Sequence, residues 1–253
     1  MSADRTDVAA YALRLGDDAL VLAQRLGEWA GRAPAIEEDI ALTNIALDLL
    51  GQARALLTYA GELEGAGRTE DDLAFHRDER DFTNLLLVEL PIGDFGVTVV
   101  RQLAFAAYQY LLYDALQHGA DATLAGVAGK AVKEVAYHRD HATQWTLRLG
   151  DGTEESHRRM QEAVDRVWPY TREMFDSDPL VRRLAAAGVA VDPARLRPDW
   201  DRYVDAVLAE ATLRRPEDGW HPTGGRSGRH TEHFGYLLAE MQHLPRSHPG
   251  ATW

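Results

Sequence analysis

Apolar residues recur at helical spacing along most of this chain. In the first such segment the apolar positions are separated by seven, four and three residues, which places them on one helix face. They are Leu15, Leu22, Leu26 and Trp29. Glycine and proline follow at once, between residues 31 and 34, and they are expected to end this helix.

A second helix is predicted from about Ile36 to Glu62, and it carries two apolar stripes. The first stripe contains Ile36, Ile40, Leu47, Leu50 and Leu57, and the second contains Ile45, Leu49 and Leu56. A helix that is apolar on two faces is expected to be buried among neighbouring helices. The pattern therefore predicts a central position for this helix.

The same periodicity predicts further helices, separated by segments rich in glycine, proline and acidic residues. One helix begins near Asp78, and others cover about 95–117, 121–149, 153–175, 193–213 and 230–244. A short helix is predicted after 179, an extended loop over 214–229, and a short tail to Trp253. No strand pattern of convincing length occurs. Long helices joined by short loops are typical of an antiparallel bundle. We predict an all-α fold in which residues 1–253 form a single domain with additional C-terminal helices.

Composition and charge narrow the classes of function. The formal net charge is −13 and the isoelectric point is about 5.2, which disfavours general binding to nucleic acids and to anionic membranes. The chain has no cysteine, so disulfides, iron–sulfur clusters and cysteine nucleophiles are excluded. We find no signal peptide and no run of 18 apolar residues, and we expect a cytoplasmic protein.

Two polar stripes interrupt the apolar faces. Asn44, Asp48 and Gln52 follow one another at intervals of four on the second helix. On the helix over 121–149, a second stripe contains Lys130, Glu134, His138, His141 and Trp145. Buried polarity needs a reason, and a metal centre is one hypothesis. Di-iron bundles place one Glu on each of two helices and a Glu-x-x-His pair on each of the other two.

The ligand set of such a centre is incomplete here. Val135 stands three residues before His138, where Glu is required. In the second helix, Leu49 and Gln52 occupy the positions where the Glu and the His of a Glu-x-x-His pair are required. Leucine and valine have no donor atom for iron. We therefore predict no metal and no catalytic residue, and instead a structural polar network at these degenerate positions, with Asp48 facing Lys130 or Lys133. The positions are Asp48, Leu49, Gln52, Lys130, Lys133, Glu134, Val135 and His138. Two literal Glu-x-x-His strings, at 154–157 and 240–243, lie away from the middle of the bundle.

Two charged segments are candidates for binding. Residues 76–84 place Arg77 and Arg80 at a predicted helix start, where they could hold a phosphate or simply form a solvated, salt-bridged cap. The loop over 223–230 is rich in glycine and arginine but lacks the pattern of a phosphate-binding loop. We expect this loop to dock on the bundle or on a partner subunit, with His230 and His233 in capping or surface roles.

Several long motifs carry a family resemblance. They are AYALRLGDDALVLAQRLGEWAGRAP (10–34), LDLLGQAR (47–54), RDERDFTNLLLVE (77–89), KEVAYH (133–138) and TGGRSGRHTEHFGYLLAEMQ (223–242). Together they resemble the PaaC family, the structural subunits of multicomponent bacterial phenylacetyl-CoA epoxidases. The resemblance extends from about residue 8 to Trp253.

The resemblance implies a ferritin-like fold and a set of partners. Members of the family pair with the catalytic di-iron subunit PaaA, which epoxidises the ring of phenylacetyl-CoA, and the heterodimers associate further. A reductase supplies electrons from NADPH through FAD and an iron–sulfur centre, and no cofactor is expected in this chain. Phenylacetyl-CoA is expected near the subunit boundary. By position, the substrate-binding candidates are Arg77, Arg80, Asp81, Phe82, Thr83 and Asn84.

The sequence is compatible with three functions. The first is a scaffold that pairs with the catalytic subunit. The second is a stand-alone di-iron oxygenase with an atypical ligand set that includes Asp48, Glu134 and His138. The third is a module that binds CoA thioesters without catalysis.

Overall fold

The chain is folded into helices joined by loops. The computed structural model describes residues 3–251, and this range contains no β-strand. The all-α class predicted from the spacing of apolar residues is confirmed. The helices form two compact units, one of Met1–Pro91 with Thr223–Trp253 and the other of Ile92–Pro222. The single domain over 1–253 stays a prediction, and its outermost positions, 1–2 and 252–253, lie outside the described residues.

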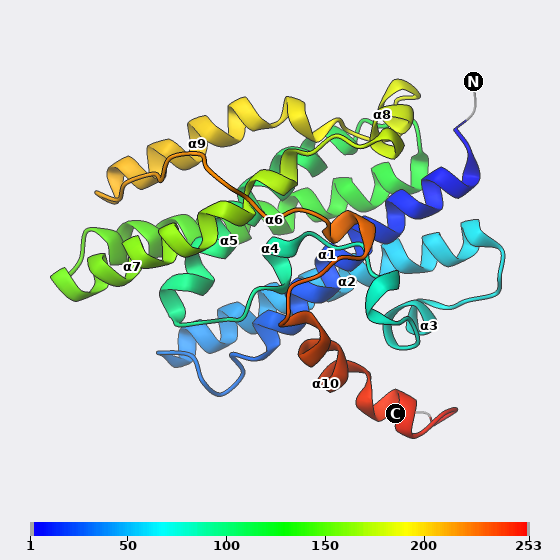
Figure 1. Cartoon of the computed structure of the whole chain (residues 1–253), viewed down its shortest axis with the longest axis horizontal. Helices are drawn as coiled ribbons and strands as arrows, with labels where there is room; N and C mark the ends of the chain where they lie inside the picture. Colours follow the sequence, from blue (N-terminus) through cyan, green and yellow to red (C-terminus); the bar gives the residue numbers. More distant parts are fainter. Residues whose placement is uncertain (1–2, 252–253) are drawn as a thin grey trace. The chain divides into compact units, whose positions relative to one another are not determined.

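The first unit is built on two long antiparallel helices, which Figure 1 shows side by side in blue and light blue. Its elements are α1 (Arg5–Gly27), α2 (Ile36–Glu64), α3 (Glu70–Phe75), the 3-10 turn η1 (Glu79–Asp81), α4 (Leu86–Glu89), the 3-10 turn η5 (Gly225–Ser227) and α10 (Phe234–Ser247). Asp4 caps α1 by accepting the backbone N–H of Thr6 at 2.9 Å. The C-terminal segment, from Thr223 onward, therefore lies in the same unit as the N-terminal helices.

The second unit also contains two long helices, α5 and α6, to which shorter helices are added. Its elements are α5 (Phe95–Leu116), α6 (Ala122–Gly150), α7 (Glu154–Val167), the 3-10 turns η2 (Trp168–Tyr170) and η3 (Arg172–Phe175), α8 (Pro179–Ala186), η4 (Pro193–Arg195) and α9 (Arg197–Glu210). The buried indole of Trp200 donates from Nε1 to the carbonyl oxygen of Ala104 at 2.8 Å, and this bond ties α9 to α5.

Some helix boundaries differ from those expected. The helix predicted over 153–175 is α only as far as Val167, because Pro169 lies in the 3-10 turn that follows and cannot supply an N–H to continue the ladder. The helix predicted over 193–213 is α only within α9. The last helix begins at Phe234 rather than near His230 and includes Pro245. These are differences in extent, whereas α3 (Glu70–Phe75) is a helix that the spacing did not predict.

The prediction of a continuous helix from Asp78 through Leu90 is wrong. Only η1 and the short α4 form there. The backbone N–H groups of Thr83 and Leu85 donate instead to the side chains of Asp17 and Asp18, both at 2.8 Å. Since an N–H that serves a buried carboxylate cannot also close a helical turn, this segment stays extended between the two short helices.

The prediction that α2 is buried on both apolar faces is also wrong. The stripe of Ile45, Leu49 and Leu56 is buried. In the other stripe, Ile36, Ile40 and Leu47 are 72%, 57% and 59% exposed, whereas Leu50 is half-buried and Leu57 is buried. The length and apolar composition of α2 alone would allow a membrane span, and only 39% of that stretch is buried in the structure. The high apolar content of α2 therefore reflects a buried face together with an exposed apolar face.

Candidate functional site

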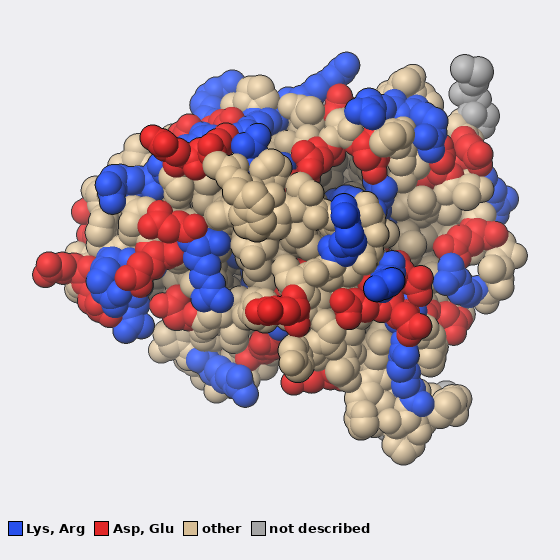
Figure 2. All heavy atoms as spheres, in the orientation of Figure 1, with Lys and Arg blue, Asp and Glu red and all other residues tan. Residues whose placement is uncertain are grey.

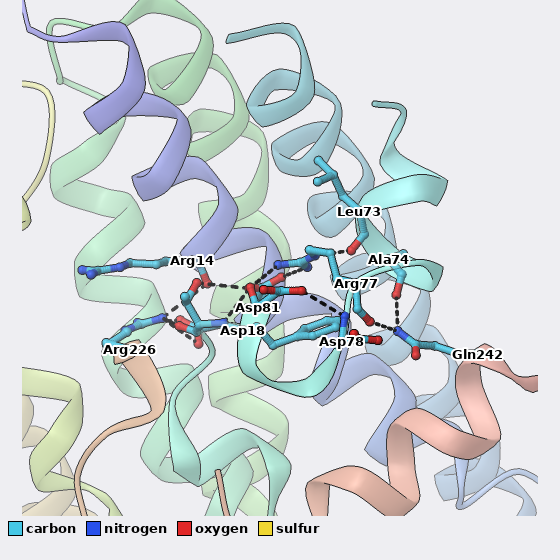
Figure 3. A network of polar contacts seen from close by, with 12 residues as sticks. Arg14, Asp18, Leu73, Ala74, Arg77, Asp78, Asp81, Arg226 and Gln242 are labelled. Atoms are coloured by element: carbon cyan, nitrogen blue, oxygen red, sulfur yellow. Dashed lines mark hydrogen bonds and ion pairs between the residues drawn. The ribbon is translucent and has the colours of Figure 1, made fainter. Parts of the chain in front are cut away.

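Two adjacent aspartates of α1 lie inside the first unit. Asp17 is fully buried and Asp18 is 3% exposed. A buried carboxylate is costly unless a cation and hydrogen-bond donors compensate it. The residues around these two side chains therefore define the main polar site of the unit, part of which Figure 3 shows from close by.

Arg77 compensates Asp17. Its Nη1 lies 3.1 Å from Asp17 Oδ2, and its Nη2 donates to Asp17 Oδ1. The same guanidinium donates from Nε to the carbonyl oxygen of Leu73 and from Nη1 to that of Asp81 at 3.0 Å. The hydroxyl of Thr83 adds a bond to Asp17 at 3.1 Å. Asp17 is thus held by a two-pronged arginine pair, which is the strongest common form of ion pair.

Arg226 compensates Asp18, and it comes from the C-terminal segment. Its Nη1 and Nη2 lie 3.0 and 2.8 Å from the two carboxylate oxygens, and Nη1 also donates to the carbonyl oxygen of Thr83 at 2.9 Å. Burial raises the pKa of Asp18 from its ordinary value of 3.8 to about 6, although the charge and hydrogen bonds of Arg226 act to lower it. Desolvation outweighs the ion pair because Asp18 is almost completely removed from water.

Glu89 and His230 form a third buried pair in the same unit. His230 Nδ1 lies 2.8 Å from Glu89 Oε2, and Nε2 lies 3.0 Å from the carbonyl oxygen of Phe82. Because both ring nitrogens face acceptors, the charged imidazolium satisfies them best. Burial acts to lower the pKa of His230, but the hydrogen bond and charge of Glu89 outweigh it and hold the pKa above its ordinary value of 6.5. Asn84 donates to the same Glu89 oxygen at 2.9 Å.

Two of these pairs, Arg226–Asp18 and His230–Glu89, fasten the loop 223–233 onto α1 and onto the segment 77–89, and the third, Arg77–Asp17, joins that segment to α1. At Gly228, φ is +70°, and a Cβ there would collide with the backbone carbonyl of Arg80, so glycine is required for the close approach. Gln242 of α10 extends the network by donating to the carbonyl oxygens of Ala74 and Arg77 at 3.1 and 3.0 Å. The expectation that the loop docks on the bundle is confirmed, but the capping or surface role expected for His230 is wrong, because its side chain is fully buried against Glu89.

The structure separates the six substrate-binding candidates into two groups. Arg77, Phe82 and Asn84 are buried, and the polar side chains among them are engaged within the unit. Arg80 and Asp81 are exposed, and Thr83 is half-buried. A role in ligand binding stays a prediction. Of the two arginines, only Arg80 is exposed.

The degenerate metal positions lie in both units, with Asp48, Leu49 and Gln52 in the first and the rest in the second. Leu49 and Gln52 are buried, and Asp48 is half-buried. In α6, Val135 and His138 are buried, while Lys133 and Lys130 are exposed and Lys130 pairs with Glu134 on its own helix at 3.3 Å. The pairing of Asp48 with either lysine stays a prediction.

No group of three or more His, Asp or Glu side chains in the described range is placed to hold a metal ion. Of the two literal Glu-x-x-His strings, the first has a structural role, since His157 Nδ1 lies 2.8 Å from the carbonyl oxygen of Gly150 at the end of α6. His243, in the second string, is exposed on α10.

Sequence reasoning missed Asp17, Asp18, Glu89 and Arg226 as members of a common site. Each lies within a motif that was quoted for its resemblance, but the motifs are far apart in the chain. Adjacent aspartates in the middle of an apolar helix face were the available signal, because such a pair requires buried cations.

The helical elements are those of an all-α, ferritin-like bundle with additional C-terminal helices. The family model of the phenylacetic acid catabolic proteins matches residues 1–253, and this chain belongs to that family. The chain is also similar to one component of the 1,2-phenylacetyl-CoA epoxidase of Escherichia coli (strain K12), the subunit designated C, at 51% identity over 246 residues. That alignment covers 97% of this chain and 99% of the relative.

Proposed function

We propose that this chain is the non-catalytic structural subunit of a cytoplasmic phenylacetyl-CoA 1,2-epoxidase and pairs with the di-iron catalytic subunit PaaA. Its similarity over nearly full length to a subunit of the Escherichia coli enzyme supports a role in phenylacetate catabolism within a multisubunit assembly. The iron belongs to PaaA, and a separate reductase delivers electrons from NADPH through FAD and an iron–sulfur centre.

The exposed apolar stripe on α2 is the observation that carries the pairing. Ile36, Ile40 and Leu47 are spaced by four and seven residues, so they lie on one helix face, and each is more than half exposed. Large apolar side chains that stay exposed along one helix face are typical of protein contacts. On the face of the molecule drawn in Figure 2, by contrast, acidic and basic side chains are interspersed. The stripe is the surface that we assign to PaaA.

The donor chemistry of α2 and α6 supports a role without iron. Where a Glu-x-x-His pair would be needed, α2 carries Leu49 and Gln52, and α6 carries Val135 before His138. Leu49 and Val135 are 1% and 0% exposed, so they are packed as core residues. These residues do not fit a di-iron ligand set, because aliphatic side chains supply no donor and a neutral amide is a poor substitute for imidazole.

Co-purification tests the pairing directly. The full chain, co-expressed with a tagged PaaA, is expected to be retained with it, and Leu47→Glu is expected to reduce retention strongly because it buries a charge in the interface. Ala209→Glu, at an exposed position of α9, is the control and should be retained like the unchanged chain. Thermal unfolding of each variant checks that the fold is intact. A folded Leu47→Glu chain that is retained in full would contradict the assigned surface.

A further inference from the structure

A groove in the second unit lies among α5, α6 and α9. Its volume is about 500 Å³, which is within the range of small-molecule sites. Apolar side chains from two helices form part of the lining, and they are Ala107, Leu111 and Ala206. Charged and aromatic side chains complete it, and they are Arg139, Asp199, Arg202 and Tyr203.

Arg139 is held in place by two aromatic rings. Its guanidinium carbon lies 3.8 Å from the ring centroid of Tyr110 and 4.7 Å from that of Tyr203. The hydroxyl of Tyr203 is itself fixed by a 2.8 Å hydrogen bond to the hydroxyl of Thr143. Stacking of this kind restrains the plane of a guanidinium and leaves its N–H edge to donate.

No carboxylate within residues 3–251 forms an ion pair with Arg139. The nearby acid Asp199 is 2.8 Å from Arg202, which neutralises it. Other arginines of this unit have acidic partners: Arg215 pairs with Asp201 at 3.0 Å and with Asp205 at 2.9 Å. The lining therefore keeps one uncompensated positive charge in a chain whose net charge is −13.

We propose that this groove binds a small organic molecule whose oxyanion, a carboxylate or a phosphate, is held by the N–H edge of Arg139 while its apolar body rests on Ala107, Leu111 and Ala206. A planar guanidinium matches the two oxygens of such a group, and preorientation by the tyrosines lowers the entropy lost on binding. This site is separate from the α2 stripe and does not depend on the function proposed above.

Ligand-observed NMR on the full chain tests the groove at millimolar probe concentrations. Benzoate supplies a carboxylate on a flat apolar body, inorganic phosphate supplies the oxyanion alone, and benzamide has the shape of benzoate without the charge. Arg139→Gln removes the guanidinium. Arg148→Gln is the matched control, because Arg148 is on the same helix and stacks on Trp145 at 5.0 Å but does not line the groove.

Benzoate or phosphate is expected to bind the unchanged chain and the Arg148→Gln chain equally, and at least about tenfold more weakly to Arg139→Gln. Benzamide is expected to bind at least about tenfold more weakly than benzoate. Preference for benzoate over phosphate would assign a carboxylate ligand, and the reverse a phosphate ligand. The proposal is overturned if neither anion binds, if the anion that binds does so undiminished in Arg139→Gln, or if benzoate binds and benzamide binds equally tightly. Unchanged thermal unfolding of Arg139→Gln excludes loss of the fold as the cause.

Discussion

Replacement of Arg226 by glutamine tests whether the buried pair with Asp18 fastens the C-terminal loop. Arg226 supplies the cation and two of the hydrogen bonds to a carboxylate that is 3% exposed. In Arg226→Gln, Asp18 keeps the bond from the Leu85 N–H but loses the charge that lowers its pKa. The pKa of Asp18 is therefore expected to rise further above about 6.

The change in the free energy of unfolding can be worked out from the ion pair between Asp18 and Arg226. A neighbouring cation typically lowers the pKa of an aspartate by about 1–3, and each pH unit corresponds to about 1.36 kcal/mol. Since Asp18 already has a folded-state pKa above its ordinary 3.8, its ionisation destabilises the fold as pH rises through about 6. The loss of unfolding free energy in Arg226→Gln is therefore expected to be about 1.4–3 kcal/mol larger at pH 8 than at pH 5.

Urea unfolding followed by circular dichroism at both pH values measures this difference. Arg80→Gln, which changes an exposed arginine of the same unit, is the control and should alter stability little at either pH. The double change Asp18→Asn with Arg226→Gln should remove the extra pH dependence, because no carboxylate is left to titrate. An Arg226→Gln chain that loses equal stability at pH 5 and pH 8 would refute the coupling.

Four further outcomes are expected. The purified chain should contain much less than one iron per molecule by elemental analysis, whereas two irons that disappear in Glu134→Ala would establish a stand-alone oxygenase. His230→Asn should lower stability more at pH 6 than at pH 9, because a His with a raised pKa stabilises the fold below its unfolded-state pKa and loses this contribution as pH rises through the folded-state pKa. Gly228→Ala should cost roughly 1–3 kcal/mol in urea unfolding, because φ is positive and the backbone of Arg80 is in contact. Calorimetric titration with phenylacetyl-CoA should give heat that decreases in Arg80→Ala if residues 77–84 bind the CoA moiety, and no heat would remove the binding-module hypothesis.

The spacing of apolar residues was sufficient for the helical class and for most helix positions. The predicted second helix, about Ile36–Glu62, differs from α2 by two residues at its end, and the helix over 121–149 matches α6 within one residue at each end. Helical spacing is a local property, since each turn closes its own hydrogen bonds, and the pattern therefore identifies a helix without knowledge of its neighbours.

The segment 78–90 shows where local reasoning fails. Its composition favours a helix, but Asp17 and Asp18 take the N–H groups of Thr83 and Leu85, and these acids lie more than sixty positions away in the chain. The exposed face of α2 is a second case. Periodicity showed two apolar stripes, but it could not show that one of them stays exposed from Ile36 to Leu47.

The sequence alone determined the helical elements, the absence of cysteine chemistry, the mismatch of Leu49, Gln52 and Val135 with a di-iron ligand set, and the family resemblance. Tertiary structure alone decided which motifs meet. Arg77, Arg226 and His230 reach their acidic partners only when α1, the segment 77–89 and the loop 223–233 pack together. The physical reason is that an ion pair depends on distance in space, which the chain sets through packing, whereas a helix depends on spacing along the chain, which the sequence displays directly.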